Sequence, residues 1–264
     1  MSITDSSPLG RIFQGVEAWN DWRKNHSAPP DLEDVILVQA DLARANLRDV
    51  NLSGAILTQA NLQRADLCNS ILLNARLERA HLQGANLSNA YLSEARLEDA
   101  DLTHANLVGA LLLEACCRKT MLVGADLRGA IAHRSDFIQA NLIGAVLRGT
   151  DLSEATLIGA LLIKANLSGA LLQGANLSLA DLSRANLAGA NLAGANLSGA
   201  TLSEANLQHA NLTGANLNGA SLEGADLGNA ILLGVTLDNA QLTEAILAPD
   251  LDVPELQLSD FDLG

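Results

Sequence analysis

The sequence predicts an all-β solenoid, and three regularities of one five-residue unit carry this prediction. Forty-four such units follow one another from Pro30 to about Pro249 without an insertion or a deletion. The central residue is Leu in 41 units, and the residue two before it is Ala in 36. Of the 21 glycines, 17 stand two residues after a centre. A repeat this short can bury its apolar residues only by stacking on its neighbours.

The five-residue period fits neither a regular helix nor a regular strand. Five residues turn an α-helix by roughly 140° beyond a full turn, so the leucines would spiral around it. A strand needs inward residues at every second position. Here Ala and Leu alternate at spacings of two and three, which suits short straight pieces joined by corners. The three centres that are not Leu are Cys117, Ala132 and Phe137.

The residue two after each centre marks the predicted corner. Besides the glycines, several units carry asparagine there, namely Asn69, Asn74, Asn89, Asn229 and Asn239. Gly and Asn tolerate the positive φ that the second central residue of a type II turn requires. Asp or Asn also precedes the centre in 23 units, where a short side chain can bond to the nearby backbone. A leucine core, an alanine bend and a glycine corner therefore agree with one another.

The run Ala-[Asp/Asn]-Leu-x-x, as in residues 185–189, resembles the pentapeptide-repeat family over about 220 of the 264 residues. The resemblance implies a right-handed quadrilateral β-helix with four units per coil. Residues 30–249 would then form about 11 coils, stacked into a rod roughly 50 Å long. The family often prefers Phe at some centres, whereas this chain has only Phe137 there.

Residues 1–29 are predicted to form an N-terminal segment with a capping α-helix at about 8–24. Ser7 followed by Pro8 is typical of a helix N-cap and first position, and Asn25 with Pro29-Pro30 ends the helix. Apolar residues recur at helical spacing, namely Ile12, Phe13, Val16, Trp19 and Trp22. Residues 15–23 also resemble a leader that precedes the repeats in cyanobacterial members of the family. Balanced charges argue against a helix lying on a membrane surface.

Residues 250–264 are predicted to be an acidic and apolar C-terminal tail or cap. Asp250 and Asp252 break the repeat frame, and Pro249 and Pro254 interrupt the chain. The tail is still rich in apolar residues, namely Leu251, Val253, Leu256, Leu258, Phe261 and Leu263. It could fold over the last coil or bind a second copy, and the sequence leaves both readings open.

The composition indicates the cellular compartment of the protein and the oxidation state of its cysteines. Three cysteines, Cys68, Cys116 and Cys117, provide no paired framework, which favours free thiols. The N-terminal residues lack a basic segment followed by an apolar run, and no apolar stretch is long enough to span a bilayer. These observations predict a soluble, cytoplasmic protein with no membrane partner, and the family resemblance implies a bacterial one.

The net charge of −14 argues against direct binding to nucleic acid. By resemblance it raises an alternative, because acidic quinolone-resistance proteins of this family mimic DNA and bind DNA gyrase. Seven arginines interrupt the acids of the repeats, however, namely Arg76, Arg79, Arg96, Arg118, Arg128, Arg134 and Arg148. A dense acidic stripe is therefore not expected, and a DNA-mimic regulator of a DNA-handling enzyme remains the alternative function.

The chain shows no pattern of catalytic or cofactor-binding residues. Its glycines are corner residues, so chance matches to phosphate-loop spacing carry no meaning. His81, Asp101 and His104 would fall on one face of adjacent coils, but solvated polar residues explain them better than a metal site. A filled rod also offers no concave pocket. We therefore expect no cofactor, no metal and no enzymatic activity.

The outer surface suggests contact with protein. With four units per coil, outward residues 20 apart form columns, and contiguous apolar columns usually mark contacts. One predicted interaction surface contains Met121, Val123, Ile138, Ile143, Ile158, Leu161 and Ile163. A second apolar column contains Leu111, Leu113, Ile131 and Leu171, with Asp151 interrupting it. The predicted function is a non-enzymatic structural or interaction rod whose partner is another protein or a second copy, as in a homodimer.

Overall fold

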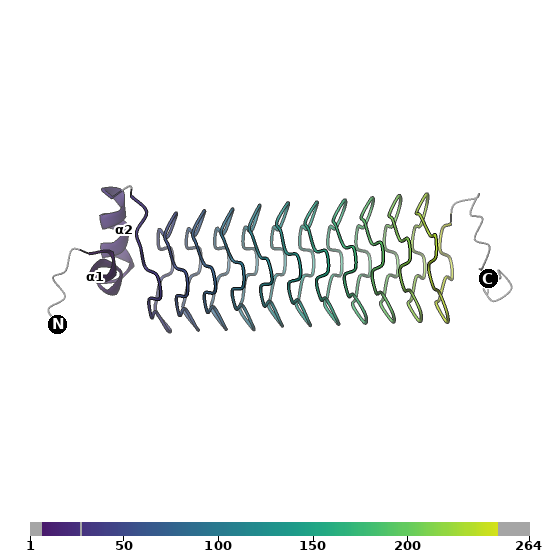
Figure 1. Ribbon diagram of the computed structural model, residues 1–264, viewed down its shortest axis with the longest axis horizontal. Helices are drawn as coiled ribbons and strands as arrows, with labels where there is room; N and C mark the ends of the chain where they lie inside the picture. The colour runs from purple at the N-terminus through teal and green to yellow at the C-terminus, as the bar shows by residue number, and fades with distance from the viewer. Residues whose placement is uncertain (1–6, 27, 248–264) are drawn as a thin grey trace.

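A computed structural model describes residues 7–26 and 28–247 of the chain. Two short helices, α1 (Pro8–Phe13) and α2 (Val16–Lys24), lie at one end of a straight rod (Figure 1). The rest of the described chain winds around the rod axis in stacked turns and reaches the other end at residue 247 (Figure 1). The predicted tail 250–264 lies outside the described residues.

Backbone hydrogen bonds stack each unit on the unit four places ahead. The Leu52 N–H donates to the Ile71 carbonyl at 2.7 Å, and the Ile71 N–H donates to the Val50 carbonyl at 2.9 Å. Residues 20 apart, such as Asn51 and Ile71, therefore form parallel bridges of one residue each, and no longer strand occurs in the described chain. The fold is a solenoid with four units per turn, as the resemblance implied.

Each corner is a β-turn that begins at a central residue. The Leu52 carbonyl accepts the Ala55 N–H at 3.0 Å, and Gly54, the second residue within the turn, has φ +65°. All 43 described corners share this conformation, with φ between +54° and +69°. Only 17 of them are Gly and five are Asn, so the fold also holds 21 other residues in the left-handed region. The predicted type II turn is confirmed, and the backbone imposes it on side chains that do not favour it.

The interior is filled by the residues that the sequence places inward. The centres from Leu32 to Leu232 are buried, and so are the alanines two before them from Ala45 onward. Four buried polar residues replace alanine, namely Ser70, Thr120, Ser135 and Thr150. Each hydroxyl donates to an interior carbonyl, as Thr120 does to Leu97 at 2.8 Å. These buried hydroxyls are satisfied, so they add little penalty to the core.

Gly169 offers a clean test of the corner conformation. Its φ is +63°, and a Cβ built on it meets no atom within 4 Å. The left-handed conformation costs an L-residue about 1–2 kcal/mol, whereas glycine loses about 0.5–1 kcal/mol of extra entropy on folding. Gly169→Ala should therefore lower the free energy of unfolding by about 1 kcal/mol. Denaturant melts should show a smaller loss for Gly169→Asn, and equal melts for Ala and wild type would contradict this account.

The predicted N-terminal helix is divided in two. Ser7 caps α1 through a bond from the Gly10 N–H to its hydroxyl at 3.1 Å, and Asn25 ends α2, as expected. The helical conformation is interrupted at Gln14 and Gly15, where Gly15 has φ +101°. This break redirects α2, so helical spacing does not carry across it. Phe13, predicted on the buried face, is consequently 56% exposed, which corrects that assignment.

Helix α2 covers the part of the first coil's backbone edge that lies near Asn46. Trp19 is fully buried, and its indole N–H donates to the Asn46 carbonyl at 2.7 Å. The Asn20 side chain accepts the Asn46 N–H at 2.8 Å and donates to the Arg44 carbonyl at 3.1 Å. Arg23 donates to the Arg48 carbonyl at 2.8 Å. The Asn46 and Arg48 groups are ones that a preceding coil would otherwise pair, so side chains of α2 take the place of that coil along this part of the edge.

Candidate interaction surfaces

The solenoid presents four flat sides, each built from units 20 residues apart. We name them by one centre each: side A contains Leu112, side B Cys117, side C Leu122 and side D Leu127. On every side the residues just before and just after the centre face outward, while the centre points into the core. Neighbouring coils therefore place equivalent outward residues in columns along the rod.

The surface predicted around Ile143 lies mainly on side C. The Gly124 N–H donates to the Ile143 carbonyl at 3.0 Å, and the Gly144 N–H donates to the Ile163 carbonyl at 2.9 Å. This register aligns Val123, Ile143 and Ile163 in one column, all partly exposed. Met121 and Leu161 are exposed beside them, and Ile138 and Ile158 align on side B. We call these seven residues the side-C surface.

The second predicted column lies on side A. Leu113, Ile131 and Leu171 are each about two-fifths exposed, and Leu111 is partly exposed. Bridges connect Leu111 with Ile131, Ile131 with Asp151, and Asp151 with Leu171. Asp151 thus separates Leu171 from the other three, as expected from the sequence.

Side A also holds apolar residues that the sequence reasoning missed. Ile71 bridges to Tyr91, and Tyr91 bridges to Leu111, so the column begins two coils earlier. Tyr91 is 45% exposed, and Leu73 is exposed beside Ile71. The signal was available, because these residues lie 20 and 40 positions before Leu111 and Leu113. Side A therefore carries an uninterrupted apolar ladder over four coils, containing Ile71, Leu73, Tyr91, Leu111, Leu113 and Ile131.

Side B is charged over the coils that precede Cys117, and its charges are paired. Arg96 lies 3.2 Å from both Glu78 and Glu98, and Glu78 also lies 3.3 Å from Arg76. Partial burial works to raise the pKa of Glu78. Hydrogen bonds from its own backbone N–H and from Thr58, together with Arg76, outweigh that effect and lower the pKa. Alternating charges of this kind do not produce a negative stripe.

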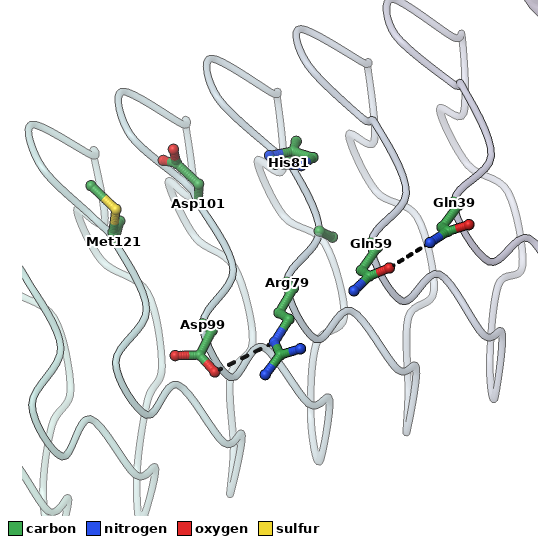
Figure 2. A pocket seen from close by; sticks show the side chains of 8 residues that line it. Gln39, Gln59, Arg79, His81, Asp99, Asp101 and Met121 are labelled. Atoms are coloured by element: carbon green, nitrogen blue, oxygen red, sulfur yellow. Dashed lines mark hydrogen bonds and ion pairs between the residues drawn. The ribbon is translucent and has the colours of Figure 1, made fainter.

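A shallow groove of about 530 Å³ follows the corner between sides B and C (Figure 2). Figure 2 shows one row of corner side chains, in which Gln39 donates to Gln59 at 2.7 Å and Arg79 lies 3.9 Å from Asp99. His81, Asp101 and Met121 form a second row beside it (Figure 2). The polar groups of the first row bond to one another, so they are not arranged around a common point where a ligand would sit.

The side chains of His81, Asp101 and His104 do not converge on one point where a metal ion could bind. His81 bridges to Asp101 in one column, but His104 occupies a corner and its ring covers Gly124 of the next coil. Partial burial works to raise the pKa of Asp101, yet hydrogen bonds from Thr103 and Gln83 outweigh it and lower the pKa. Within residues 7–26 and 28–247, no group of three or more His, Cys, Asp or Glu residues could hold a metal ion.

The three cysteines are free thiols, and two of them, Cys116 and Cys117, are poorly suited to nucleophilic chemistry. Cys117 is buried as a core centre, and burial raises the pKa of its thiol well above the usual value. Partial burial also raises the pKa of Cys116, whose side chain faces outward near Glu98. Since the thiolate is the reactive form, both shifts disfavour nucleophilic reactivity.

No helix in the described part of the chain is long and apolar enough to cross a membrane.

Comparison with known proteins places this geometry in a family. A family model described as pentapeptide repeats matches eight times, over residues 31–64, 60–99, 90–129, 121–157, 140–178, 150–187, 180–219 and 220–248. None of the curated proteins matches the chain.

Solved structures of other repeat proteins are similar to this chain. HetL, a pentapeptide repeat protein involved in heterocyst differentiation regulation in the cyanobacterium Nostoc sp. strain PCC 7120, is 35% identical, with a TM-score of 0.51. That alignment covers 86% of this chain and 95% of HetL. The protein alr5209 of Nostoc PCC 7120 is 41% identical over 39% of this chain and 84% of its own, with a TM-score of 0.23.

A third similar structure is QnrB1, a plasmid-mediated fluoroquinolone resistance protein. It is 23% identical over 79% of this chain and 94% of its own, with a TM-score of 0.39. At this similarity its role in resistance carries no argument for the present protein. The family matches cover nearly every repeat from residue 31 to residue 248, and the solenoid has the corresponding four-unit turns. This chain is a member of the pentapeptide-repeat family.

Proposed function

We propose that this protein is a non-enzymatic rod that binds another protein through apolar residues on its flat sides. The observation that carries the proposal is the uninterrupted ladder on side A together with the side-C surface on another flat side. Contiguous exposed apolar patches on a folded protein usually mark contact sites. The groove between sides B and C is shallow and lined by side chains that bond to one another, which suits recognition of a surface better than catalysis.

The finer architecture forms part of the same proposal. We infer 11 right-handed coils from residue 30 to residue 249, with α2 acting as the N-terminal cap. Four-unit turns and the bonds from Trp19, Asn20 and Arg23 to the first coil support this arrangement. A rod whose core repeats at every turn holds its outward residues at fixed spacing, so it can present a ladder without rearranging.

HetL, similar in sequence over most of this chain, is involved in regulating heterocyst differentiation. A regulatory role that operates by binding a protein partner is consistent with the surfaces of this chain. DNA mimicry is less well supported, because the carboxylates of side B alternate with arginines that pair with them.

The double substitution Ile143→Lys with Ile163→Lys tests the side-C surface. Placing an unpaired charge in a desolvated contact commonly costs several kcal/mol, enough to disrupt a modest complex. The variant should keep its melting temperature but lose association in light scattering or retrieval of partners in a pull-down. Ser183→Lys with Ser203→Lys, in the same column on polar coils, is the matched control and should change neither measurement.

Two results would contradict the side-C prediction. One is a wild-type protein that stays monomeric at high concentration and retrieves the same partners as the Ile143 and Ile163 double variant. The other is an equal loss in the serine control, which would indicate a general effect of added positive charge on this side.

A further inference from the structure

The ladder on side A is a row of apolar side chains at a constant spacing. Bridges connect Ile71 with Tyr91, Tyr91 with Leu111, and Leu111 with Ile131, so each residue lies one coil beyond the previous one. Neighbouring coils are about 4.8 Å apart, and the four residues therefore cover about 14 Å. Because the described coils stack into a straight rod (Figure 1), these residues follow the direction of its axis. A partner that contacts all four must extend along the rod.

The spacing of the ladder fits an α-helix better than a strand. A helix lying along the rod repeats its apolar face about every 5.4 Å, once per turn. Between Ile71 and Ile131 it falls out of register by about 2 Å, less than half the distance between coils. A strand in the same direction repeats its face about every 6.7 Å, so it falls out of register by about 6 Å, more than a whole coil. About 10 helical residues span the ladder.

One edge of the ladder carries exposed acidic side chains. Glu94 and Glu114 occupy the corner that follows side A on successive coils. The Glu94 N–H donates to the Leu113 carbonyl at 2.9 Å, which places this corner directly beside the ladder. Arg134, at the same corner on the next coil, lies 2.8 Å from Glu154. Neither Glu94 nor Glu114 forms an ion pair with another residue in the part of the chain that the structure describes.

The opposite edge of the ladder is uncharged at the equivalent corners. The corner residues that precede side A on these coils are Asn69, Asn89, Gly109 and Gly129. A helix lying on the ladder therefore meets corner carboxylates along one flank only. Basic side chains on that flank would pair with these carboxylates, and such complementarity sets the orientation of a partner.

We propose that the ladder on side A binds an amphipathic α-helix of another protein, which lies along the rod with its apolar face on the ladder. Lysine or arginine residues on one flank of this helix pair with Glu94 and Glu114. The inference rests on the proposed function and adds to it the kind of partner and its direction on the rod. Binding of a helix through apolar residues at i, i+3, i+4 and i+7 is a recurring mode of recognition.

A second copy of the chain suits side A less well. An antiparallel pair of rods centred on the ladder would place Glu94 of each copy opposite Glu114 of the other, and like charges facing each other disfavour a contact. A parallel pair related by a two-fold axis along the rods would place Tyr91 opposite Ser93, so the apolar side chains would not meet one another. A basic amphipathic helix meets neither difficulty.

Titration of designed peptides into the full-length protein tests the proposal. The first peptide is a helix of about 16 residues, long enough to be stable, with leucines at i, i+3, i+4 and i+7 and lysines on one flank. The second carries glutamates in place of the lysines. The third has the composition of the first, with its leucines at every second position as in a strand. Wild type should bind the lysine helix at least roughly 10-fold more tightly than either of the others.

Substitutions within the ladder locate the contact. Tyr91→Ser with Leu113→Ser should weaken binding of the lysine helix at least roughly 10-fold. The melting temperature should be unchanged, because both side chains are about two-fifths exposed. The matched control is Asn191→Ser with Thr213→Ser, in the same two columns on polar coils, and it should bind the lysine helix as wild type does.

A charge reversal tests the acidic edge. Glu94→Lys with Glu114→Lys should reverse the preference, so that the glutamate helix binds more tightly than the lysine helix. Glu223→Lys with Glu244→Lys changes the net charge equally on side C and its corner. This control should keep the preference for the lysine helix, which separates a local contact from attraction to an acidic protein.

The remaining outcomes would overturn the proposal. These are no binding of the lysine helix, equal binding of the strand-patterned peptide, or an unchanged preference in the Glu94 and Glu114 variant. Dimers of wild type in analytical ultracentrifugation that the Tyr91 and Leu113 variant does not form would assign the ladder to a second copy.

A pull-down separates failure of the helix from failure of the proposed function. If the Tyr91 and Leu113 variant loses protein partners that wild type retrieves, while no helical peptide binds, the helix is wrong and the protein-binding rod stands. If that variant retrieves the same partners as wild type and no peptide binds, side A is not a contact surface, and the proposed function loses its support there as well.

Discussion

Replacing Trp19 by alanine is expected to destabilise the first coil by about 3–5 kcal/mol, the usual range for removing a buried aromatic side chain. The Trp19 ring is fully buried, lies 5.4 Å from the Trp22 ring and donates to the Asn46 carbonyl. The substitution therefore removes apolar burial and leaves an edge carbonyl without its partner. Because each coil contacts only its neighbours, the loss should be concentrated at this end.

Exchange of the Asn46 N–H gives a local readout of this prediction. That N–H is held by the Asn20 side chain at 2.8 Å, so it should exchange faster when α2 is released from the first coil. Trp19→Phe keeps an aromatic ring but loses part of the buried indole as well as its hydrogen bond, so it should cost more than the roughly 1 kcal/mol of the bond alone and less than Trp19→Ala. Deleting residues 1–28 should go further and cause end-to-end association through the exposed edge. A monodisperse, equally stable truncated protein would show that α2 has another role.

Phe137→Leu is expected to lower the free energy of unfolding by about 1–3 kcal/mol, more than an ordinary swap between core residues. Phe137 is the one enlarged centre, and it follows Ala132, the smallest one, in the next unit. The interior cavity beside Phe137 measures only about 10 Å³, and its lining includes Cys117 but not Ala132. We expect Phe137, the enlarged centre of the next unit, to occupy the space that Ala132 leaves.

Making Ala132→Leu both in wild type and in the Phe137→Leu variant distinguishes compensation by Phe137 for the small Ala132 from ordinary core packing. Ala132→Leu in wild type should overpack the interior and destabilise it by about 1–3 kcal/mol. The same change in the Phe137→Leu background should restore stability, because the coil then has leucine at every centre. Denaturant melts of the four proteins give the coupling free energy directly. Independent effects of the two substitutions would argue that Phe137 does not occupy the space beside Ala132.

The five-residue frame by itself determined which residues are inside. The burial of the centres and of their alanines follows from the repeat, because Leu and Ala recur at the same two positions of nearly every unit and such a short unit buries them only by stacking. The outward position of Cys116 and the inward position of Cys117 were predictable for the same reason. The corners were also predictable where Gly or Asn marks them, since these residues tolerate positive φ.

Only the tertiary structure decided how the remaining corners and the N-terminal end are built. Stacking forces Leu179 and twenty other residues that are neither Gly nor Asn into positive φ, because each coil must turn where its neighbours turn. How α2 meets the first coil depends on the Trp19 indole reaching the Asn46 carbonyl, a contact that helical periodicity does not encode. In the sequence, Asn20 is an ordinary polar residue of a helix. Its bond with the Asn46 N–H becomes evident only in the folded chain. Long-range contacts set these features, so the local pattern of a five-residue repeat does not contain them.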